Sequence, residues 1–395
     1  MELFVGTFNA PYLYTLSFDP HLAHLNVTHI SNATAYHPWL SFAPNQKTLY
    51  ATTWEPPGVA AYKIHRDDDA SSHTLELINS NPVVELPGYV TATNSYLYSA
   101  GCASGEVFRV ESDGALGDLA QQLYFPIGGS EGVSPPGRVA GIANGTHSVD
   151  PSPDGDTLYV ADIGANGVWT FTVSEANGNP AVLTDQQLHG APRDHDGPRH
   201  AWPHPDGKIL YTIGEHSNMV DVFRVKKHCN GTVKDLEHLQ GASVLPQGSN
   251  VTHFAADEVR LSTGPPGSPP QYLFASTRGR VNNANGYVSA FELDTEGKLV
   301  HTEAVDIWET PTSGESANAV EPAPWVAAAS PDAPSQQYLA LTDDIAGKLR
   351  ILTFDGAQFQ ELVAVTLEVP AYDKEFNGTV EAATAVWLRP VEETA

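Results

Sequence analysis

Four residues of this chain have side chains that together could transfer a proton and bind an oxyanion: His147, Glu215, Arg199 and Arg278. His and Glu titrate and can serve as a general acid or base, while a guanidinium group binds negative oxygen atoms through parallel donors. Such a set suits acid-assisted chemistry on a small-molecule substrate. The four residues lie far apart in the chain, so the fold must bring them together.

A repeated pattern of strands and turns supplies that fold. The clearest copies are Val149–Asp162 and Ala201–Gly214, each with a short run, a Pro-Asp-Gly turn and an apolar run containing Tyr. The pattern recurs at Leu40–Tyr50 and, more weakly, at Tyr96–Tyr98, Tyr272–Phe274 and Tyr338–Ala340. Self-similarity made only of strands and turns is typical of a β-propeller with one four-stranded sheet per repeat.

The two ends of the chain predict how the ring closes. Leu3–Thr7 reads as the second strand of a blade without a first strand, and Ala383–Leu388 reads as a first strand with nothing after it. Joining them gives a seventh blade and removes open sheet edges. We therefore predict an all-β, seven-bladed propeller that spans residues 1–395 as a single domain. An array of β-sandwiches or two small barrels is the alternative.

In a blade, the start of the innermost strand and the end of the second strand open on the same face. The repeats place His147, Arg199 and Asn318 at innermost-strand starts. They place at second-strand ends Trp54, Asp162, Glu215, Arg278 and Asp343. We expect these residues to converge on one central mouth, with Trp39, Trp54, Trp202 and Trp325 as apolar walls. Alternatively, they tie neighbouring blades together through buried hydrogen bonds and salt bridges, and Trp387 is expected to pack between blades.

Composition narrows the class of protein. No stretch of 18 or more apolar residues occurs, so we expect no membrane insertion. The net charge of −27 argues against nucleic acid and against anionic membrane surfaces as partners. Helical periodicity is weak and is centred on Thr184–His189. Long loops are expected at Pro126–Thr146, Gly190–Pro198, Gly264–Pro270 and Thr310–Ser316, and the oligomeric state is left open.

Six Asn-x-Thr sequons suggest passage through a secretory pathway: Asn26, Asn32, Asn144, Asn230, Asn250 and Asn377. Residues 1–30 contain no signal peptide, because Leu3–Thr7 already reads as a strand. We expect a mature secretory or extracellular protein, with a cytoplasmic location as the alternative.

Cofactor motifs are missing from the sequence. There is no CxxC, no clustered Cys/His zinc pattern and no HExxH, so no metal is predicted, and His195 and His200 are expected to be exposed loop histidines. No phosphate loop or dinucleotide fingerprint occurs, so no cofactor is predicted. GxSxG is absent too, which weighs against a serine hydrolase. Cys102 and Cys229 are expected to lie far apart around the ring, so a disulfide between them is not expected.

At these residues the chain resembles the fungal 3-carboxy-cis,cis-muconate cyclases, within the lactonase-type seven-bladed propellers. The resemblance is strongest in Gly145–His147, Pro198–Arg199, Glu215, Phe274–Arg278, Ser316–Val320 and Thr342–Asp344. It implies that His147, Arg199, Glu215 and Arg278 match the family's active-site positions. Two features depart from the family: Ser313–Ser316 has Glu315 where the family pattern has Gly-His, and the Pro126–Thr146 insertion is unfamiliar.

The resemblance extends to cyclases of fungal secondary metabolism, including hetero-Diels–Alderases. These departures, the acidic charge and the sequons lead us to predict that reaction: a cofactor-free joining of a tropolone quinone methide to a humulene-type sesquiterpene, giving a dihydropyran. Glu215 or His147 would assist loss of water, and Arg199 and Arg278 would bind the tropolone oxygens. The alternatives are a carboxymuconate cyclase or related lactonase, and a non-catalytic secreted binding propeller.

Overall fold

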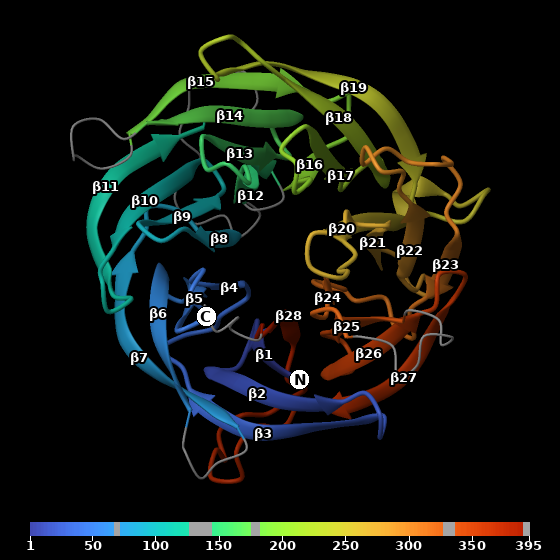
Figure 1. Ribbon diagram of the computed structural model, residues 1–395. Helices are drawn as coiled ribbons and strands as arrows, with labels where there is room; N and C mark the ends of the chain where they lie inside the picture. Colours follow the sequence, from blue (N-terminus) through green and yellow to red (C-terminus); the bar gives the residue numbers. More distant parts are fainter. Residues whose placement is uncertain (67–71, 126–143, 175–181, 327–335, 390–395) are drawn as a thin grey trace.

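The computed structural model describes residues 1–66, 72–125, 144–174, 182–326 and 336–389. Within these residues the chain forms seven four-stranded antiparallel sheets, which stand as blades around a central axis (Figure 1). Each blade runs from an innermost strand at the axis to an outermost strand at the rim. The predicted all-β, seven-bladed propeller is therefore confirmed.

The strands follow one another regularly along the chain. From the axis outwards, blade one contains β28 (Ala382–Trp387), β1 (Glu2–Thr7), β2 (Tyr12–Asp19) and β3 (His24–Asn32), and blade two contains β4 (Leu40–Phe42), β5 (Thr48–Trp54), β6 (Pro57–Arg66) and β7 (His73–Pro82). Blade three contains β8 (Tyr89–Ala92), β9 (Tyr96–Gly101), β10 (Ser104–Val110) and β11 (Leu116–Tyr124). Blade four contains β12 (Thr146–Pro151), β13 (Thr157–Asp162), β14 (Gly167–Ser174) and β15 (Val182–Gly190).

Blade five contains β16 (Pro198–Pro203), β17 (Ile209–Gly214), β18 (Met219–Lys227) and β19 (Val233–Ser243). Blade six contains β20 (Phe254–Leu261), β21 (Tyr272–Gly279), β22 (Tyr287–Glu292) and β23 (Asp306–Glu309). Blade seven contains β24 (Val320–Pro322), β25 (Gln337–Asp343), β26 (Lys348–Phe354) and β27 (Phe359–Thr366). A short 3-10 helix, η2 (Val251–His253), precedes β20.

Both chain ends contribute to blade one, as the sequence predicts. Leu3 pairs with Trp387 and Val5 with Ala385, so β28 lies antiparallel to β1 beside the axis. The indole of Trp387 is buried and donates to the carbonyl oxygen of Glu321 in blade seven at 2.9 Å. The last strand therefore completes blade one and also contacts the blade that precedes it in the ring.

The burial of each strand follows from its place in the blade. The second strands β9, β13 and β17 are buried at every position, because both of their faces are covered by neighbouring blades. Between the first and second strands, the predicted Pro-Asp-Gly turns form at Gly155 and Gly207, with φ of 74° and 71°. Glycine adopts this left-handed conformation without a steric penalty, which explains its place in the repeat.

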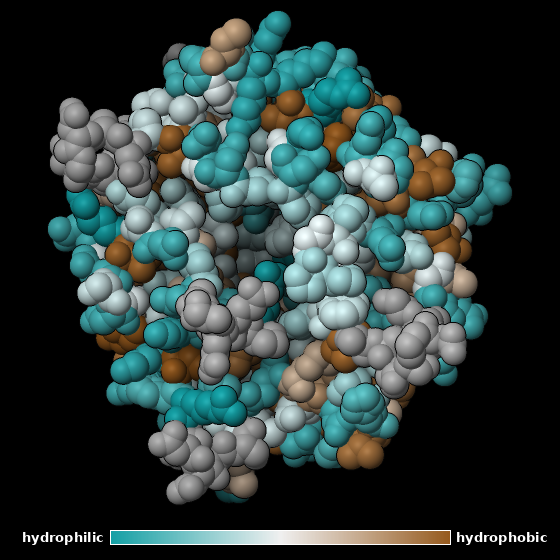
Figure 2. All heavy atoms as spheres, in the orientation of Figure 1, coloured by the Kyte–Doolittle hydropathy of each residue, from teal (hydrophilic) through white to brown (hydrophobic). Residues whose placement is uncertain are grey.

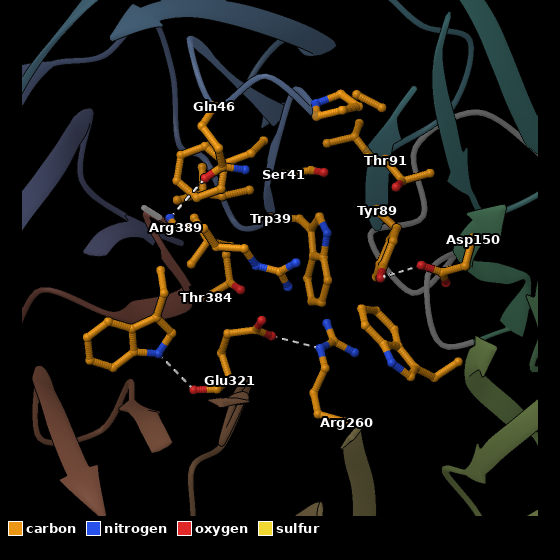
Figure 3. Close-up of a pocket in the computed structure, with 18 of the residues that line it drawn as sticks. Trp39, Ser41, Gln46, Tyr89, Thr91, Asp150, Arg260, Glu321, Thr384 and Arg389 are labelled. Carbon is orange, nitrogen blue, oxygen red and sulfur yellow. Dashed lines mark hydrogen bonds and ion pairs between the residues drawn. The ribbon is translucent and has the colours of Figure 1, made fainter. Parts of the chain in front are cut away.

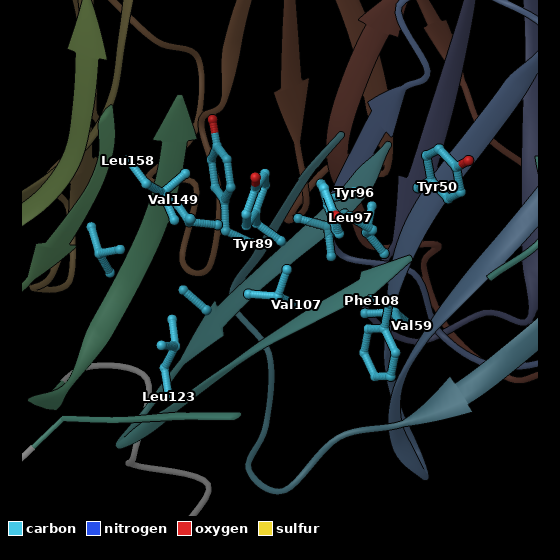
Figure 4. Packing of buried hydrophobic residues seen from close by; sticks show 14 of the residues in the cluster. Tyr50, Val59, Tyr89, Tyr96, Leu97, Val107, Phe108, Leu123, Val149 and Leu158 are labelled. Atoms are coloured by element: carbon cyan, nitrogen blue, oxygen red, sulfur yellow. The ribbon is translucent and has the colours of Figure 1, made fainter. Parts of the chain in front are cut away.

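Apolar clusters between the blades hold the ring together. One cluster joins Tyr50 of blade two, Tyr98 of blade three and Leu158 of blade four (Figure 4). Another joins Ile351 of blade seven to Trp387 of blade one. Further clusters connect the remaining neighbours, so every blade packs on the next. Burial of this apolar surface, at about 25 cal/mol per Å², is the main force that closes the ring.

Two sequence expectations about irregular segments have different outcomes. The weak helical candidate at Thr184–His189 is wrong, because these residues belong to β15 and pair with β14. A register shift in this pairing and the positive φ of Asp185, 53°, mark a bulge that interrupts the two-residue period of the strand.

Three of the four predicted long loops are confirmed, because Gly190–Pro198, Gly264–Pro270 and Thr310–Ser316 connect strands. Most of the fourth, residues 126–143, lies outside the described residues. None of the helices found in the described part of the chain has the length and apolar character needed to cross a bilayer.

Candidate active site

A cavity of about 300 Å³ opens on the axis of the ring. Figure 2 shows the molecule hollowed at the centre of one face. The residues that line the cavity come from all seven blades and their loops: Phe8, Pro38, Trp39, Trp54, Gly88, His147, Arg199, Glu215, Asp257, Arg278, Glu315, Ser316, Ala317, Ala319 and Ala383. The four residues predicted to be catalytic all belong to this set, which we call the upper cavity.

Two arginines, the buried Arg199 and the half-buried Arg278, and two buried carboxylates form the charged wall of the upper cavity. Arg199 contacts Glu215 at 3.3 Å and Asp257 at 2.9 Å, and Arg278 contacts the same two carboxylates at 3.4 Å each. Arg280 adds a third ion pair to Glu215. Glu215 is therefore a counter-ion shared by three guanidinium groups.

Some of these contacts are ion pairs without hydrogen-bond alignment. Among the described residues, no hydrogen-bond partner lies in line with Nε of Arg199 or Nε of Arg278, although both atoms are buried within 3.5 Å of a carboxylate. Buried donors normally have aligned acceptors. The two guanidinium groups can therefore realign on an anionic ligand that enters the cavity.

Asp257 is a member of this wall that was not predicted from the sequence. Its Oδ2 accepts a hydrogen bond from the backbone N–H of Asn318 at 2.8 Å. Burial alone would raise the pKa of Asp257, but the charges of Arg199 and Arg278 outweigh it and hold that pKa below its ordinary value. The signal in the sequence was two consecutive acids, Asp257 and Glu258, within the otherwise apolar start of an innermost strand.

A chain of hydrogen bonds runs from His147 away from the upper cavity. Nδ1 of His147 lies 3.1 Å from Nε2 of His200, and Nδ1 of His200 lies 2.5 Å from Oε1 of Glu258. His200 was expected to be an exposed loop histidine, and this expectation is wrong: it is 1% exposed and belongs to β16, whereas His195 is exposed as expected.

Protonation of these histidines is disfavoured. Burial, together with the charge of Arg199, lowers the pKa of His147 and of His200 well below the ordinary value, so both imidazoles are neutral. Arg199 also places Nη1 3.1 Å from Nε2 of His200. A guanidinium cannot accept, so Nε2 of His200 accepts and its Nδ1 carries the hydrogen.

This assignment fixes the state of the residue that faces the cavity. Because Nε2 of His200 is an acceptor, Nδ1 of His147 must be the donor in the bond between the two rings. Nε2 of His147 then carries a lone pair, and His147 lines the upper cavity. In its resting state the site therefore presents a neutral imidazole base beside two guanidinium groups.

Backbone bulges place these residues. The pairing register shifts around His147 in β12, around Arg199 in β16, and between Ala256 and Val259 in β20. A bulge inserts an extra residue and re-aims neighbouring side chains. It allows adjacent residues such as Arg199 and His200 to reach the same centre, which regular strand alternation would not allow.

Aromatic side chains line the upper cavity opposite the charged wall. Trp54 packs on Phe8 with ring centroids 5.3 Å apart, and its indole N–H donates to the carbonyl oxygen of Pro87 at 2.9 Å. Trp39 stacks on Tyr89 at 4.1 Å. The structure therefore brings Trp39 and Trp54 to the cavity together with the four predicted catalytic residues.

Five other predicted substrate-binding residues are not among those that line the upper cavity. Asp162 accepts from the indole of Trp169 at 2.8 Å, and Asp343 pairs with Arg350 at 2.7 Å. Asn318 donates to the carbonyl oxygen of Thr277 at 3.0 Å. These three residues stabilise hairpins and loops, which is the alternative that the sequence left open. Trp325 is half-buried, and Trp202 lies further along its strand.

Trp202 instead lines a second cavity of about 600 Å³, which we call the lower cavity (Figure 3). It lies at the ends of the innermost strands, whereas the upper cavity lies at their starts: β12 contributes Asp150 below and His147 above. Trp39 lines both cavities and so separates them. The indole of Trp202 covers the guanidinium of Arg260 at 4.1 Å.

Most of the sequon asparagines are exposed to solvent. Five of them are exposed: Asn32, Asn144, Asn230, Asn250 and Asn377. Asn26 is half-buried within β3, where it pairs with Ser17 of β2. The two cysteines are free, with Cys102 buried and Cys229 exposed.

Comparison with known proteins shows the same architecture. The family model described as "Lactonase, 7-bladed beta-propeller" matches residues 2–368. The chain also resembles solved structures of a periplasmic gluconolactonase of Pseudomonas aeruginosa (TM-score 0.72, 21% identity, covering 98% of each chain) and of a putative 6-phosphogluconolactonase of Bacteroides fragilis (TM-score 0.70, 20% identity, covering 98% of this chain and 97% of that one). At these identities the likeness concerns the fold alone.

Sequence comparison gives a nearer relationship. A protein of Cutaneotrichosporon cutaneum named muconate cycloisomerase 1 is 37% identical over 391 residues, which cover 98% of each chain. The carboxy-cis,cis-muconate cyclase of Neurospora crassa is 24% identical and covers 94% of this chain and 97% of that protein. The relatives thus include cyclases and lactonases, and the resemblance seen in the sequence motifs is confirmed at the level of the family. The chain belongs to the lactonase family of seven-bladed β-propellers.

Proposed function

We propose that this protein is a lactonising cyclase, which closes an unsaturated dicarboxylate of the muconate type into a lactone. The observation that carries the proposal is a pair of guanidinium groups, that of the buried Arg199 and that of the half-buried Arg278, beside the neutral imidazole of His147 in one small cavity. Two cationic forks suit a substrate with more than one carboxylate. The name of the 37% identical relative supports the same class of reaction.

The reaction forms one carbon–oxygen bond and one carbon–hydrogen bond. An oxygen of one substrate carboxylate attacks a carbon of the conjugated double bond, the π electrons move to the neighbouring carbon, and that carbon takes a proton. A dianion thereby becomes a monoanionic lactone, so each turnover consumes one proton from solvent. The guanidinium groups hold the carboxylates and orient the attacking oxygen.

His147 is the residue that we propose transfers this proton. Glu215, the other candidate from the sequence, pairs with three guanidinium groups, and we propose that it serves as their counter-ion. Nε2 of His147 belongs to a residue that lines the cavity, and its Nδ1 is engaged by His200. Proton transfer requires direct reach to the reacting carbon, which this placement favours.

The size and polarity of the cavity support a small anionic substrate. At about 300 Å³ the cavity lies at the lower end of the range of ligand sites, roughly 300–1,000 Å³. Charged residues form one wall and aromatic residues the other. The hetero-Diels–Alder reaction remains a prediction from the sequence: it would use the aromatic wall, but a tropolone joined to a sesquiterpene is a large and mostly apolar occupant.

The test is incubation of the purified protein with cis,cis-muconate and with 3-carboxy-cis,cis-muconate. We expect loss of the diene absorbance of one or both, and appearance of a lactone in the proton NMR spectrum. His147→Gln is expected to abolish the conversion while it preserves the fold by circular dichroism. Unchanged diene with both compounds would remove the proposal. A parallel incubation with a tropolone carbinol and a humulene-type terpene tests the sequence prediction.

Hydrolysis of lactones is a second candidate, because the resting site offers a base. A lone pair on Nε2 of His147 can take a proton from water, which then attacks a lactone carbonyl polarised by Arg199 or Arg278. Titration of the acid released from sugar and aryl lactones measures this activity. Acid release without any cyclisation of muconates would favour it over the first proposal.

A further inference from the structure

The hydrogen-bonded chain behind His147 extends away from the upper cavity and ends at a carboxyl group. Glu258 is 1% exposed, and it contacts His200 at 2.5 Å, the backbone N–H of Val259 at 3.1 Å and the guanidinium of Arg260. Neither Glu258 nor His200 is among the residues that line the upper cavity. Two buried titratable residues, His200 and Glu258, are therefore connected to His147 by hydrogen bonds but do not line the upper cavity.

The cavity poses an electrostatic difficulty that these two residues resolve. Lactonisation requires a hydrogen on Nε2 of His147, yet an imidazolium there would lie beside Arg199 and Arg278, and burial disfavours it too. A neutral imidazole carries a hydrogen on Nε2 only if its Nδ1 has none. The hydrogen on Nδ1 must therefore have somewhere to go.

We propose that Glu258, His200 and His147 form one proton relay, in which His147 gives and takes protons at Nε2 while both imidazoles stay neutral and the charge changes on Glu258. The inference rests on the proposed function and assigns the source of the proton in that reaction. It makes Glu258 and His200 positioning residues that act through His147.

The relay has two states that differ by one proton. In the empty state Glu258 is a carboxylate, each ring carries its hydrogen on Nδ1, and Nε2 of His147 has a lone pair. In the loaded state a proton bound at Nε2 of His147 has displaced the hydrogen of Nδ1 to Nε2 of His200, and that of His200 to Oε1 of Glu258. Each N–H bond broken is replaced by one new N–H or O–H bond. Delivery to the substrate carbon reverses the shift.

The surroundings of Glu258 allow it to change charge near neutral pH. Burial raises the pKa of Glu258 to about 7, against the opposing effect of Arg260. The charged and titratable groups that act on it come from five innermost strands: Tyr89, Asp150, Arg199, His200, Asp257, Arg260 and Glu321. The relay can therefore pass between its two states near neutral pH.

Arg260 stays in place in both states. Its Nε donates to Glu321 at 2.8 Å, and Trp39 and Trp202 cover its guanidinium (Figure 3). Loss of the negative charge on Glu258 therefore leaves Arg260 with one carboxylate partner. This second partner separates the role of Glu258 in the relay from its role in neutralising Arg260, and it supplies the control variant for the test.

Arg199 connects the relay to the substrate. Its hydrogen bond to Nε2 of His200 is compatible only with the empty state, because in the loaded state that nitrogen bears a hydrogen. A substrate carboxylate that draws Arg199 towards the cavity removes this bond and favours loading. Binding of the dianion is therefore expected to take up a proton, which is the proton that the reaction consumes.

The test that needs no substrate is nitrogen-15 NMR of the histidine-labelled protein, since ring nitrogens with and without hydrogen have distinct shifts. His147→Gln and His200→Gln assign the signals by their disappearance. We expect both rings to be Nδ1–H tautomers at high pH and to convert together to Nε2–H tautomers as pH falls through about 7. Glu258→Gln is expected to hold both rings in the Nδ1–H form.

Kinetics supply the second readout. Glu258→Gln is expected to lower kcat for lactonisation by roughly 100-fold or more, since general acid catalysis contributes about 10²–10⁴. A smaller rise in KM is expected as well, because the variant stays in the empty state, in which Arg199 is bonded to His200. Wild-type kcat should fall as pH rises through about 7, and Glu258→Gln should lose this dependence. The control Glu321→Gln also removes a carboxylate from Arg260. It should keep kcat at low pH and keep a pH-dependent profile, displaced towards lower pH because a negative charge that raises the pKa of Glu258 is lost.

Each outcome decides one of the two proposals. Imidazolium signals at His147, or Nε2–H tautomers at high pH, would overturn the relay even if the protein cyclises muconates. Tautomers that convert near pH 7 in a protein inactive on muconates would leave the relay standing and remove the proposed function. If Glu258→Gln keeps the wild-type kcat, the role of Glu258 is limited to neutralising the charge of Arg260.

Discussion

Arg199 donates from Nη1 to Nε2 of its neighbour in the chain, His200, across 3.1 Å. Because a guanidinium has no lone pair to offer, this single contact assigns the hydrogen on both rings of the histidine pair. The same arginine contacts Glu215 and Asp257 in the upper cavity. Arg199 thus joins the proposed substrate-binding wall to the proposed proton donor, and the two functions are expected to respond together when it moves.

Replacement of Arg278 by lysine should weaken binding of dicarboxylates. A hydrogen bond to a charged group contributes about 1.5–3 kcal/mol, so we expect KM to rise roughly 10- to 100-fold in Arg278→Lys, with a smaller effect on kcat. Steady-state kinetics with cis,cis-muconate measure the change. Arg224→Lys is the control, because Arg224 pairs with Glu237 on the exposed outer part of blade five. An unchanged KM would place substrate carboxylates elsewhere.

Asp257→Asn should destabilise the fold as well as the site. Removing one partner of a buried ion pair costs about 3–5 kcal/mol, and here both Arg199 and Arg278 lose a carboxylate partner. The exposed Asp235 provides the control substitution, with an expected cost near zero. Urea unfolding at neutral pH measures both variants.

The pH dependence follows from the lowered pKa of Asp257. Its ionisation contributes stability above the ordinary pKa of Asp, about 3.9, and this contribution is lost as pH falls through the lower folded value. The stability difference between wild type and Asp257→Asn should therefore shrink in acid. A difference that grows as pH falls would contradict the assignment.

Asp150 should have the opposite pH dependence. Its Oδ1 accepts from the hydroxyl of Tyr89 at 2.9 Å, its Oδ2 has no partner among the described residues, and burial raises its pKa to about 7. The stability linked to its protonated form is complete below the ordinary pKa and is lost as pH rises through about 7. Asp150→Asn, which stays neutral, should narrow the fall in melting temperature from pH 6 to pH 8. An equal fall in both proteins would disprove this.

Trp387→Ala tests ring closure. The side chain is 3% exposed, packs edge-on against Phe18 and bonds to the carbonyl oxygen of Glu321, so we expect a loss of about 3–5 kcal/mol. Tyr372→Ala, at a side chain that is 68% exposed, is the control. Comparable unfolding midpoints for the two variants would show that blade one does not depend on its terminal strand.

The sequons predict glycans on an outer surface. In a host that secretes the protein, we expect mass spectrometry to find N-linked glycans at exposed sequons such as Asn230 and Asn250, and none at Asn26, which is half-buried in a paired strand. Secretion with all sequons unmodified would contradict the secretory interpretation. Modification of Asn26 would show that β3 forms after glycan transfer.

The sequence was sufficient to predict where residues at equivalent positions of the repeated blades lie. His147 and Arg199 occupy the same place in successive blades, so the repeat predicts that they meet at the axis, and the paired ends of the chain predict how the ring closes. The sequence could not predict the partners of these residues. His200 and Glu258 reach the axis because bulges interrupt strand alternation, and a bulge depends on the pairing of two strands rather than on local residue types.

Some aromatic and acidic residues that were predicted to line the upper cavity do not line it, because the repeat pattern does not give depth along the axis or side-chain direction. Trp39 and Trp202 both have innermost-strand positions in the repeat, but they lie at different depths along the axis, and only the first reaches the upper cavity. Asp162 and Asp343 end second strands as predicted, yet their carboxylates turn to Trp169 and Arg350 within their own blades. The position of a residue in the repeat determines the face of the ring on which it lies, whereas the direction of its carboxylate depends on the nearest hydrogen-bond donor.

The joining of β28 to β1 has a consequence for biosynthesis. During synthesis, β1 (Glu2–Thr7) is translated long before its innermost neighbour, β28 (Ala382–Trp387). Until then the nascent chain exposes an unpaired strand and an apolar blade face, both of which favour aggregation. Assembly of the closed ring, and with it of the upper cavity, therefore waits until Ala382–Trp387 has been translated.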